Sequence, residues 1–155
     1  MTVRIQQEDF DVGAELARLR GANPRVGALA SFIGLARDLN EEHAVLAMTL
    51  EHYPGMTERA LEDIVHQARQ RWDIIDALIV HRIGTVLPLE QIVLVAVASA
   101  HRHDALQACG FLIDYLKTDA PFWKKEQTPQ GVRWVEARSG DEQARAAWER
   151  SGPRK

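Results

Sequence analysis

The chain has very little cysteine, no long apolar run and no excess of positive charge, and each shortage excludes a class of protein. Cys109 is the only cysteine among 155 residues, which excludes an internal disulfide, a Cys-x-x-Cys redox pair and a zinc site built from several cysteines. No apolar stretch approaches the roughly 20 residues needed to span a membrane. The net charge of −3 argues against a nucleic-acid-binding protein, so an anion site would need a local cluster of basic residues.

Several motifs of catalysis and nucleotide binding are also missing from the sequence. It contains neither G-x-G-x-x-G nor G-x-x-x-x-G-K-[ST], so dinucleotide and P-loop sites lack their phosphate-cradling glycines. It contains neither the H-E-x-x-H motif of zinc proteases nor the G-x-S-x-G elbow of serine hydrolases. Residues 1–8 lack the apolar core of a signal peptide, and we therefore expect a cytoplasmic protein.

A single domain is expected over residues 1–150, because the sequence has no repeat, low-complexity tract or flexible linker. Apolar periodicity predicts helices at 11–20, 57–71, 104–116 and 141–150, and strands at 26–36, 45–52, 74–83, 91–100 and 132–137. Residues 84–90 are expected to form a loop and residues 151–155 a disordered tail. Helices interspersed with paired strands indicate an α+β or mixed α/β domain and not a regular βαβ array.

Local signals predict helix ends and buried faces. Asp11, Thr57 and Asp104 are expected to cap the N-termini of the first three helices, because such side chains accept hydrogen bonds from the first turn. The strand at 26–36 is expected to be buried. Leu46 should lie with Met48 and Leu50 on one strand face, and Leu106 should face the core from its helix. 

The most informative segment is 115–126 (YLKTDAPFWKKE), in which lysines surround a proline and an aromatic pair. Pro121 must end the preceding helix, and the break allows Lys124 to fold back toward Lys117. Converging cations beside aromatic surface can hold an anionic substrate, and a partly desolvated lysine can lose its proton near neutral pH. The alternative is a solvated basic turn, which composition alone favours.

The junction 99–104 (SAHRHD) lies where a strand is expected to end and a helix to begin, which is a natural anion site. Arg102 could bind a phosphate and His101 could move a proton. Equally, Asp104 could cap the helix while both histidines are solvated. His101 and His103 also permit a metal-dependent hydrolase, although no third histidine has a ligand spacing.

Two isolated residues each have a structural and a functional interpretation. Arg37 follows an expected strand, from which it could reach into a cleft or pair with Asp38 on the surface. Cys109 lies in an apolar helical segment, where cysteine behaves as a small buried hydrophobe more often than as a reactive thiol.

Five segments together resemble the large, catalytic subunit of molybdopterin synthase. They are residues 32–37 (FIGLAR), 50–56 (LEHYPGM), 99–102 (SAHR), 115–126 (YLKTDAPFWKKE) and 133–137 (RWVEA). Their order and spacing match from about residue 10 to residue 148, and the fourth segment is the most specific. One departure is Leu35-Ala36, where the family pattern has a small polar residue followed by valine.

The resemblance implies a fold and an activity. The family fold is an α/β hammerhead core with an added antiparallel β subdomain. The family enzyme is a sulfurtransferase of molybdenum-cofactor biosynthesis, in which a homodimer of large subunits binds a small ubiquitin-like subunit at each end to form a heterotetramer. The small subunit brings sulfur as a C-terminal thiocarboxylate. The substrate is cyclic pyranopterin monophosphate (precursor Z), which becomes the dithiolene molybdopterin, and no bound cofactor or metal is implied.

The resemblance also implies roles for individual residues. Lys117 and Lys124 would be catalytic, the first by polarising the thiocarboxylate or acyl intermediate and the second by assisting proton transfer or opening of the cyclic phosphate. The residues expected to bind substrate are Arg37, His101, Arg102, Lys117 and Lys124. His101 and Arg102 would act in their own subunit or across the dimer. Phe122 and Trp123 would shape a groove for the partner's tail. A non-catalytic module that binds a ubiquitin-like partner is the alternative.

Overall fold

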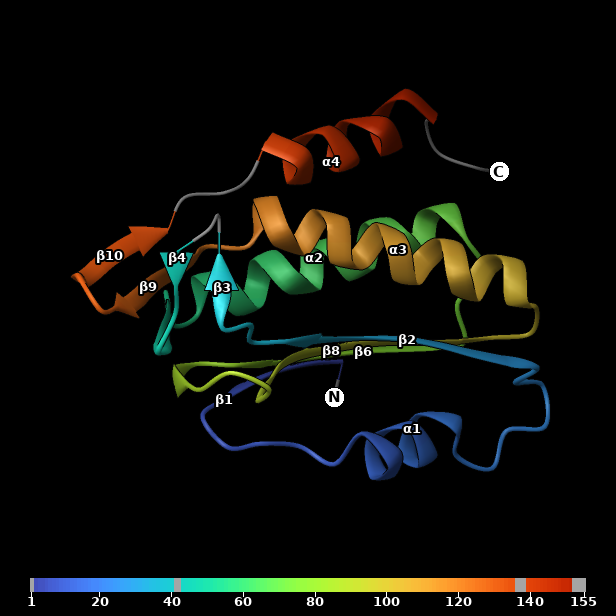
Figure 1. Cartoon of the computed structure of the whole chain (residues 1–155). Helices are drawn as coiled ribbons and strands as arrows, with labels where there is room; N and C mark the ends of the chain where they lie inside the picture. Colours follow the sequence, from blue (N-terminus) through green and yellow to red (C-terminus); the bar gives the residue numbers. More distant parts are fainter. Residues whose placement is uncertain (1, 41–42, 136–138, 152–155) are drawn as a thin grey trace.

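The computed structural model describes residues 2–40, 43–135 and 139–151, which form two four-stranded β-sheets, a two-stranded β3-β4 sheet and four helices (Figure 1). The strands are β1 Val3–Gln6, β2 Ala28–Leu35, β3 Leu39–Asn40, β4 His43–Ala44, β5 Ala47–His52, β6 Asp76–Arg82, β7 Gly84–Val86, β8 Gln91–Ser99, β9 Phe122–Thr128 and β10 Gly131–Val135. The helices are α1 Val12–Arg20, α2 Met56–Arg71, α3 Arg102–Asp119 and α4 Ser139–Ser151. The mixed α+β class expected from the sequence is confirmed.

The first sheet has the strand order β1-β6-β8-β2 and is covered on both faces. Helix α1 lies on one face, α2 and α3 lie on the other, and α4 lies over α3 (Figure 1). The central strands β6 and β8 are therefore apolar on both sides. Ile79 and Val95 belong to the core under α2 and α3, whereas Val80 and Leu94 pack with α1. This double burial explains their nearly continuous apolar sequences.

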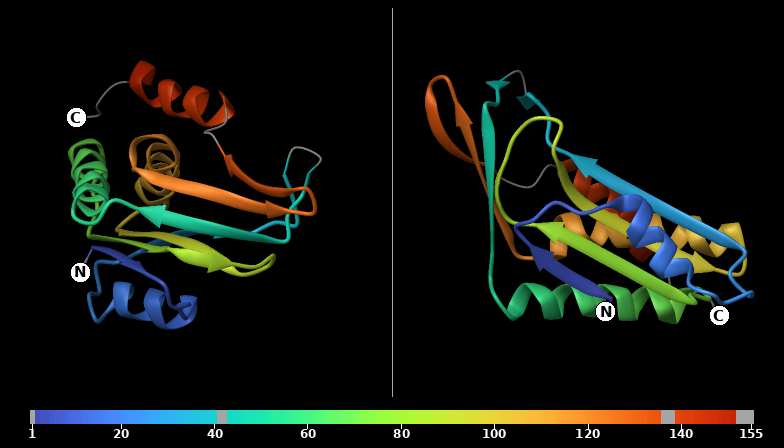
Figure 2. Two further views of the ribbon diagram at one scale, coloured as in Figure 1. Left: turned by 90° about the vertical axis from the view of Figure 1, so that its left-hand side faces the viewer. Right: turned by 90° about the horizontal axis from the view of Figure 1, so that it is seen from below.

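The second sheet, with the order β10-β9-β5-β7, is antiparallel and lies at one end of the first (Figure 2). It is the added antiparallel subdomain that the resemblance implied. The sequence interpretation was wrong about β7, which falls in the expected loop, and it predicted no strand where β9 lies. Strand β9 pairs with β5 from Ala47–Gln127 to His52–Phe122, and this tertiary pairing overrides the low strand preference of its lysines.

The cap of α1 is as expected, but the start of α2 differs. Asp11 accepts a hydrogen bond from the Ala14 amide at 3.0 Å. Gly55, not Thr57, is the N-cap of α2. The buried Thr57 hydroxyl instead accepts from the backbone amide of Tyr53 at 2.9 Å and donates to the carbonyl of Pro121 at 3.0 Å. Thr57 thus ties the start of α2 to the start of β9.

The first turn of α3 also differs from the expectation. The helix begins at Arg102 with His101 as N-cap, and in the described part of the chain no side chain makes a capping hydrogen bond there. Asp104 lies inside the first turn, where its carboxylate accepts from the Asp73 backbone amide at 3.2 Å. Leu106 is 62% exposed, so its expected core position is wrong.

Strand β2 is an edge strand of its sheet and is less buried than expected. Leu29, Phe32 and Leu35 are 37%, 38% and 49% exposed, and β2 is paired with a neighbouring strand, β8, on one side only. Leu46, expected to face inward, lies just before β5 and is 53% exposed. Among the described residues no helix is long and apolar enough to cross a membrane. The expected disordered tail was 151–155, but Ser151 is the last residue of α4, and residues 152–155 lie outside the described residues, as does the expected strand end at 136–137.

A buried carboxylate joins the β3 segment to the second sheet. Glu126 is 3% exposed and accepts hydrogen bonds from the amide of Asn40 at 3.0 Å and from the guanidinium of Arg133 at 2.9 and 3.1 Å. Arg133 also donates to the Asn40 carbonyl at 3.4 Å. These bonds connect residues far apart in sequence and hold the segment after β2 against β9.

A core truncation on α3 tests the packing of the first sheet. Leu112 is 0% exposed, and Leu112→Ala should lower the free energy of unfolding by about 2–5 kcal/mol because it leaves a cavity. Leu106→Ala, on the same helix but solvent-exposed, should change it by less than about 0.5 kcal/mol. Urea denaturation measures both, and equal effects would contradict the packing described.

Removing the Glu126 carboxylate tests the link between β3 and β9. Glu126→Ala leaves the Arg133 guanidinium and the Asn40 amide without their shared acceptor, so the free energy of unfolding should fall by about 1–3 kcal/mol. Glu62→Ala, at an exposed position of α2, is the matched control and should be nearly neutral. Urea titrations of the two variants give the comparison, and a neutral Glu126→Ala would show that the link contributes nothing.

Candidate functional site

A cavity of about 270 Å³ lies between the C-terminal end of α3 and the second sheet. Its charged lining residues are Arg37, Lys117, Glu126, Lys124 and Asp141. Apolar side chains, among them Met48, Ile92 and Leu116, form the rest of the wall. The cavity therefore combines an apolar surface with cationic groups from three separate segments.

The two lysines reach this cavity from opposite sides of the Pro121 break. Lys117 lies in the last turn of α3, where the helix dipole favours a positive charge. Helix α3 ends at Asp119 and β9 begins at Phe122. Lys124 then follows Phe122 on the inner face of β9, since alternate residues of a strand share a face. The expectation that Lys124 folds back toward Lys117 is confirmed, because both line one cavity.

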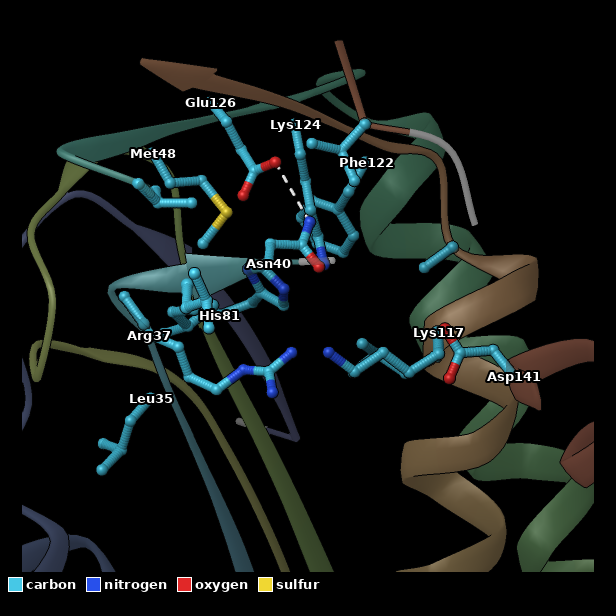
Figure 3. A pocket seen from close by; sticks show the side chains of 17 residues that line it. Leu35, Arg37, Asn40, Met48, His81, Lys117, Phe122, Lys124, Glu126 and Asp141 are labelled. Carbon is cyan, nitrogen blue, oxygen red and sulfur yellow. Dashed lines mark hydrogen bonds between the residues drawn. The ribbon is translucent and has the colours of Figure 1, made fainter. Parts of the chain in front are cut away.

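Arg37 completes the cationic lining from the other wall. It follows β2, and Figure 3 shows its side chain and that of Lys117 pointing toward one another across the cavity. Of the two carboxylates, Glu126 is bonded to Arg133, and Asp141 comes from α4. Among the described lining residues there are three cations and two acids, one of the acids already paired with Arg133, and this balance suits the cavity to an anion.

His81 is a cavity residue that the sequence analysis missed as part of this site. It lies at the end of β6 and stacks on Phe122, with ring centroids 3.8 Å apart and an interplanar angle of 15°. Burial, followed by the nearby charges of Lys117 and Lys124, lowers its pKa to about 3. The sequence carried a weak signal, a histidine that continues the apolar run of a buried strand.

Phe122 and Trp123 do not face one groove together. Phe122 points inward to His81 and the cavity. Trp123 is on the opposite face of β9, 40% exposed, with its ring centroid 5.8 Å from that of Tyr53. The same alternation places Lys125 on the face of β9 that carries Trp123, away from the cavity. Its ammonium group lies 4.7 Å from the Trp134 ring centroid and 3.4 Å from a Glu51 oxygen.

His101 and Arg102 lie away from the cavity of their own chain. Both are exposed at the N-terminus of α3, and Arg102 precedes Lys117 by fifteen helical residues, which at 1.5 Å per residue is about 22 Å. Neither residue lines the cavity that holds the lysines. Within the described ranges no three His, Cys, Asp or Glu side chains are grouped as potential metal ligands.

Helix α4 contributes Asp141 to the cavity and is anchored on α3. Arg145 binds Asp119 through two hydrogen bonds of 2.6 and 3.1 Å, and the Trp148 indole donates to Asp114 at 2.7 Å. The sequence predicted this helix but not its attachment to α3, because the attachment depends on side chains distant in sequence.

Cys109 is the small buried residue that the sequence predicted. It is 6% exposed, and burial raises the pKa of its thiol to about 11. Its sulfur lies 3.8 Å from the Val95 carbonyl oxygen, under α3 and outside the cavity lining. A neutral thiol in this position is unsuited to carry sulfur.

Comparison with known proteins gives one consistent family. The family model described as MoaE protein matches residues 5–119. A molybdopterin synthase catalytic subunit from Ralstonia nicotianae is 62% identical over 147 residues, covering 95% of this chain and 84% of that protein. A solved molybdopterin biosynthesis MoaE protein from Burkholderia ambifaria is 59% identical with a TM-score of 0.83, covering 96% and 97% of the two chains. Molybdopterin synthase from Staphylococcus aureus is 32% identical with a TM-score of 0.79, covering 86% and 96%. The chain therefore belongs to the MoaE family.

Proposed function

We propose that this protein is the catalytic subunit of a molybdopterin synthase. It transfers sulfur from the C-terminal thiocarboxylate of a small ubiquitin-like subunit to precursor Z and so makes the dithiolene of molybdopterin. The observation that carries the proposal is the cavity in which Arg37, Lys117 and Lys124 converge beside apolar surface. A phosphate-bearing pterin and an anionic thiocarboxylate both require such a site.

Lys117 is proposed to act on the thiocarboxylate and the acyl intermediate. Its place at the C-terminal end of α3 favours the ammonium form. A fixed ammonium group stabilises the negative charge that develops on the acyl oxygen when the carbonyl carbon is attacked. Sulfur arrives on the partner, which fits a chain whose one cysteine is buried with a raised thiol pKa.

Lys124 and Arg37 are proposed to act on the phosphate side of the substrate. Arg37 can bind phosphate oxygens through its planar guanidinium. Lys124, on the inner face of β9, can donate a proton as the cyclic phosphate opens. Because the two groups come from β9 and from the segment after β2, the Glu126 link between those segments fixes their separation.

His101 and Arg102 are proposed to serve the cavity of a second copy in a homodimer. They lie at the end of α3 opposite Lys117, so they can complete a lysine site only if another chain presents them. The half-exposed apolar residues of edge strand β2 offer surface for such a contact. The assembly proposed is a heterotetramer of two such chains and two small subunits, located in the cytoplasm, where a lone unpaired cysteine is ordinary.

Replacement of the α3 lysine tests the catalytic assignment. Lys117→Ala should reduce dithiolene formation from precursor Z and thiocarboxylated small subunit by at least about 100-fold, because the acyl oxygen loses its stabilising charge. Folding and binding of the small subunit should persist. Lys125→Ala, on the outer face of β9, is the matched control and should remain active. Full activity of Lys117→Ala would overturn the assignment, and a complex without any dithiolene from the unmodified chain would indicate a binding module.

Mixed dimers test whether Arg102 acts across the interface. Arg102→Ala and Lys117→Ala homodimers should each be nearly inactive. Co-expression of the two chains should restore about a quarter of normal activity, since half of randomly paired dimers are mixed and each has one intact site. Activity that stays at the level of the parent variants would show that Arg102 and Lys117 must belong to the same chain.

A further inference from the structure

His81 is a buried ionisable residue in the lysine cavity to which the mechanism above gives no task. It is 4% exposed and lies on the same face of β6 as Ala77 and Ile79. Its ring stacks on Phe122 and also lines the cavity.

The hydrogen bonding of His81 fixes which ring nitrogen carries the proton. Nδ1 lies 2.7 Å from the backbone carbonyl oxygen of Arg82. A carbonyl oxygen can only accept, so Nδ1 is the donor, and a neutral imidazole then keeps a lone pair on Nε2. Nε2 is therefore a hydrogen-bond acceptor on a ring that lines the cavity.

The charge of His81 is also fixed by its surroundings. Burial lowers its pKa to about 3, and the positive charges of Lys117, Lys124 and His52 act in the same direction, against the opposing effect of the bond to Arg82. A group with this pKa is uncharged at every pH at which enzymes normally work. His81 therefore neither attracts a phosphate by charge nor supplies a proton near neutral pH.

Charged and titratable groups reach the cavity or act on His81 from five parts of the chain. They are Lys117 from α3, Lys124 and Glu126 from β9, His52 from β5, Arg37 after β2 and Asp141 from α4. Glu126 accepts from Arg133 and Asn40. Figure 3 shows Lys117 directed toward Arg37, whereas Lys124 descends from β9 on the side of the cavity where His81 lies.

We propose that His81 is a positioning residue that offers Nε2 as a fixed, uncharged hydrogen-bond acceptor to the ammonium group of Lys124. Phe122 and Lys124 share the inner face of β9, so the stack of His81 on Phe122 also sets the position from which Lys124 starts. A neutral acceptor can orient the ammonium group through a hydrogen bond without adding a negative charge beside it. The inference rests on the proposed function and deepens it.

Three substitutions separate the acceptor from the ring. His81→Gln places an amide near the position of Nε2, His81→Asn keeps only a donor near Nδ1, and His81→Phe keeps the stack without either nitrogen. Each variant is assayed in the complete complex with thiocarboxylated small subunit and precursor Z, over a range of pH. His66→Asn, at an exposed position of α2, is the control for loss of a histidine.

His81→Asn and His81→Phe should lower kcat about tenfold or more, with a smaller change in KM. The alkaline limb of their pH profiles should move down by about one pH unit, because an ammonium group without its acceptor loses its proton more readily. His81→Gln should restore most of kcat and of the pH profile. This rescue separates the positioning of Lys124 from simple packing.

Two results would overturn the inference: full activity of His81→Phe, or equal losses in all three variants with an unchanged alkaline limb. Thermal melting shows whether each variant is folded. If His81→Phe does not fold, the comparison of His81→Gln with His81→Asn still tests whether an acceptor at the position of Nε2 is needed. Failure of the proposed function is a different observation, since the unmodified complex would then form no dithiolene.

Discussion

The end of α3 is the constraint on which the site depends. Pro121 cannot extend the helix, so the chain leaves α3 after Asp119 and enters β9 at Phe122. The Thr57 hydroxyl donates to the Pro121 carbonyl and anchors this turn on α2. Pairing of β9 with β5 then fixes the direction of the strand. A helix residue and a strand residue, seven apart in sequence, consequently line one cavity.

One of the two acidic side chains described in the cavity lining is already engaged by hydrogen bonds within the protein. Glu126 lies in the wall, but Arg133 and the Asn40 amide supply its hydrogen bonds, so the carboxylate serves to join two segments. His81 adds an aromatic ring without adding charge. The same network holds the segment that carries Arg37. Position and charge are thus set by the same few contacts, which is the condition for preorganised electrostatic stabilisation.

Local sequence predicted those features that depend on local physics. The apolar runs of β6 and β8 reflect burial on both faces, and Pro121 indicated the break between Lys117 and Lys124. Strand β9 was not predictable from its own lysines, because its extended form comes from pairing with β5. The contact of Asn40 with Glu126 spans 86 positions, and no local pattern encodes it. His81 was missed as a site residue for the same reason, since its role depends on Phe122.

Helix α3 carries Arg102 at one end and Lys117 at the other, about 22 Å apart along a single rod. In the proposed homodimer each α3 helix would contribute to two active sites, Lys117 to that of its own chain and Arg102 to that of the partner chain. The genetic consequence depends on which end is altered. In a mixed dimer with a normal chain, a chain altered at Arg102 or at Lys117 alone inactivates one of the two sites. A chain altered at both residues inactivates both sites and therefore acts as a dominant inhibitor of its normal partner.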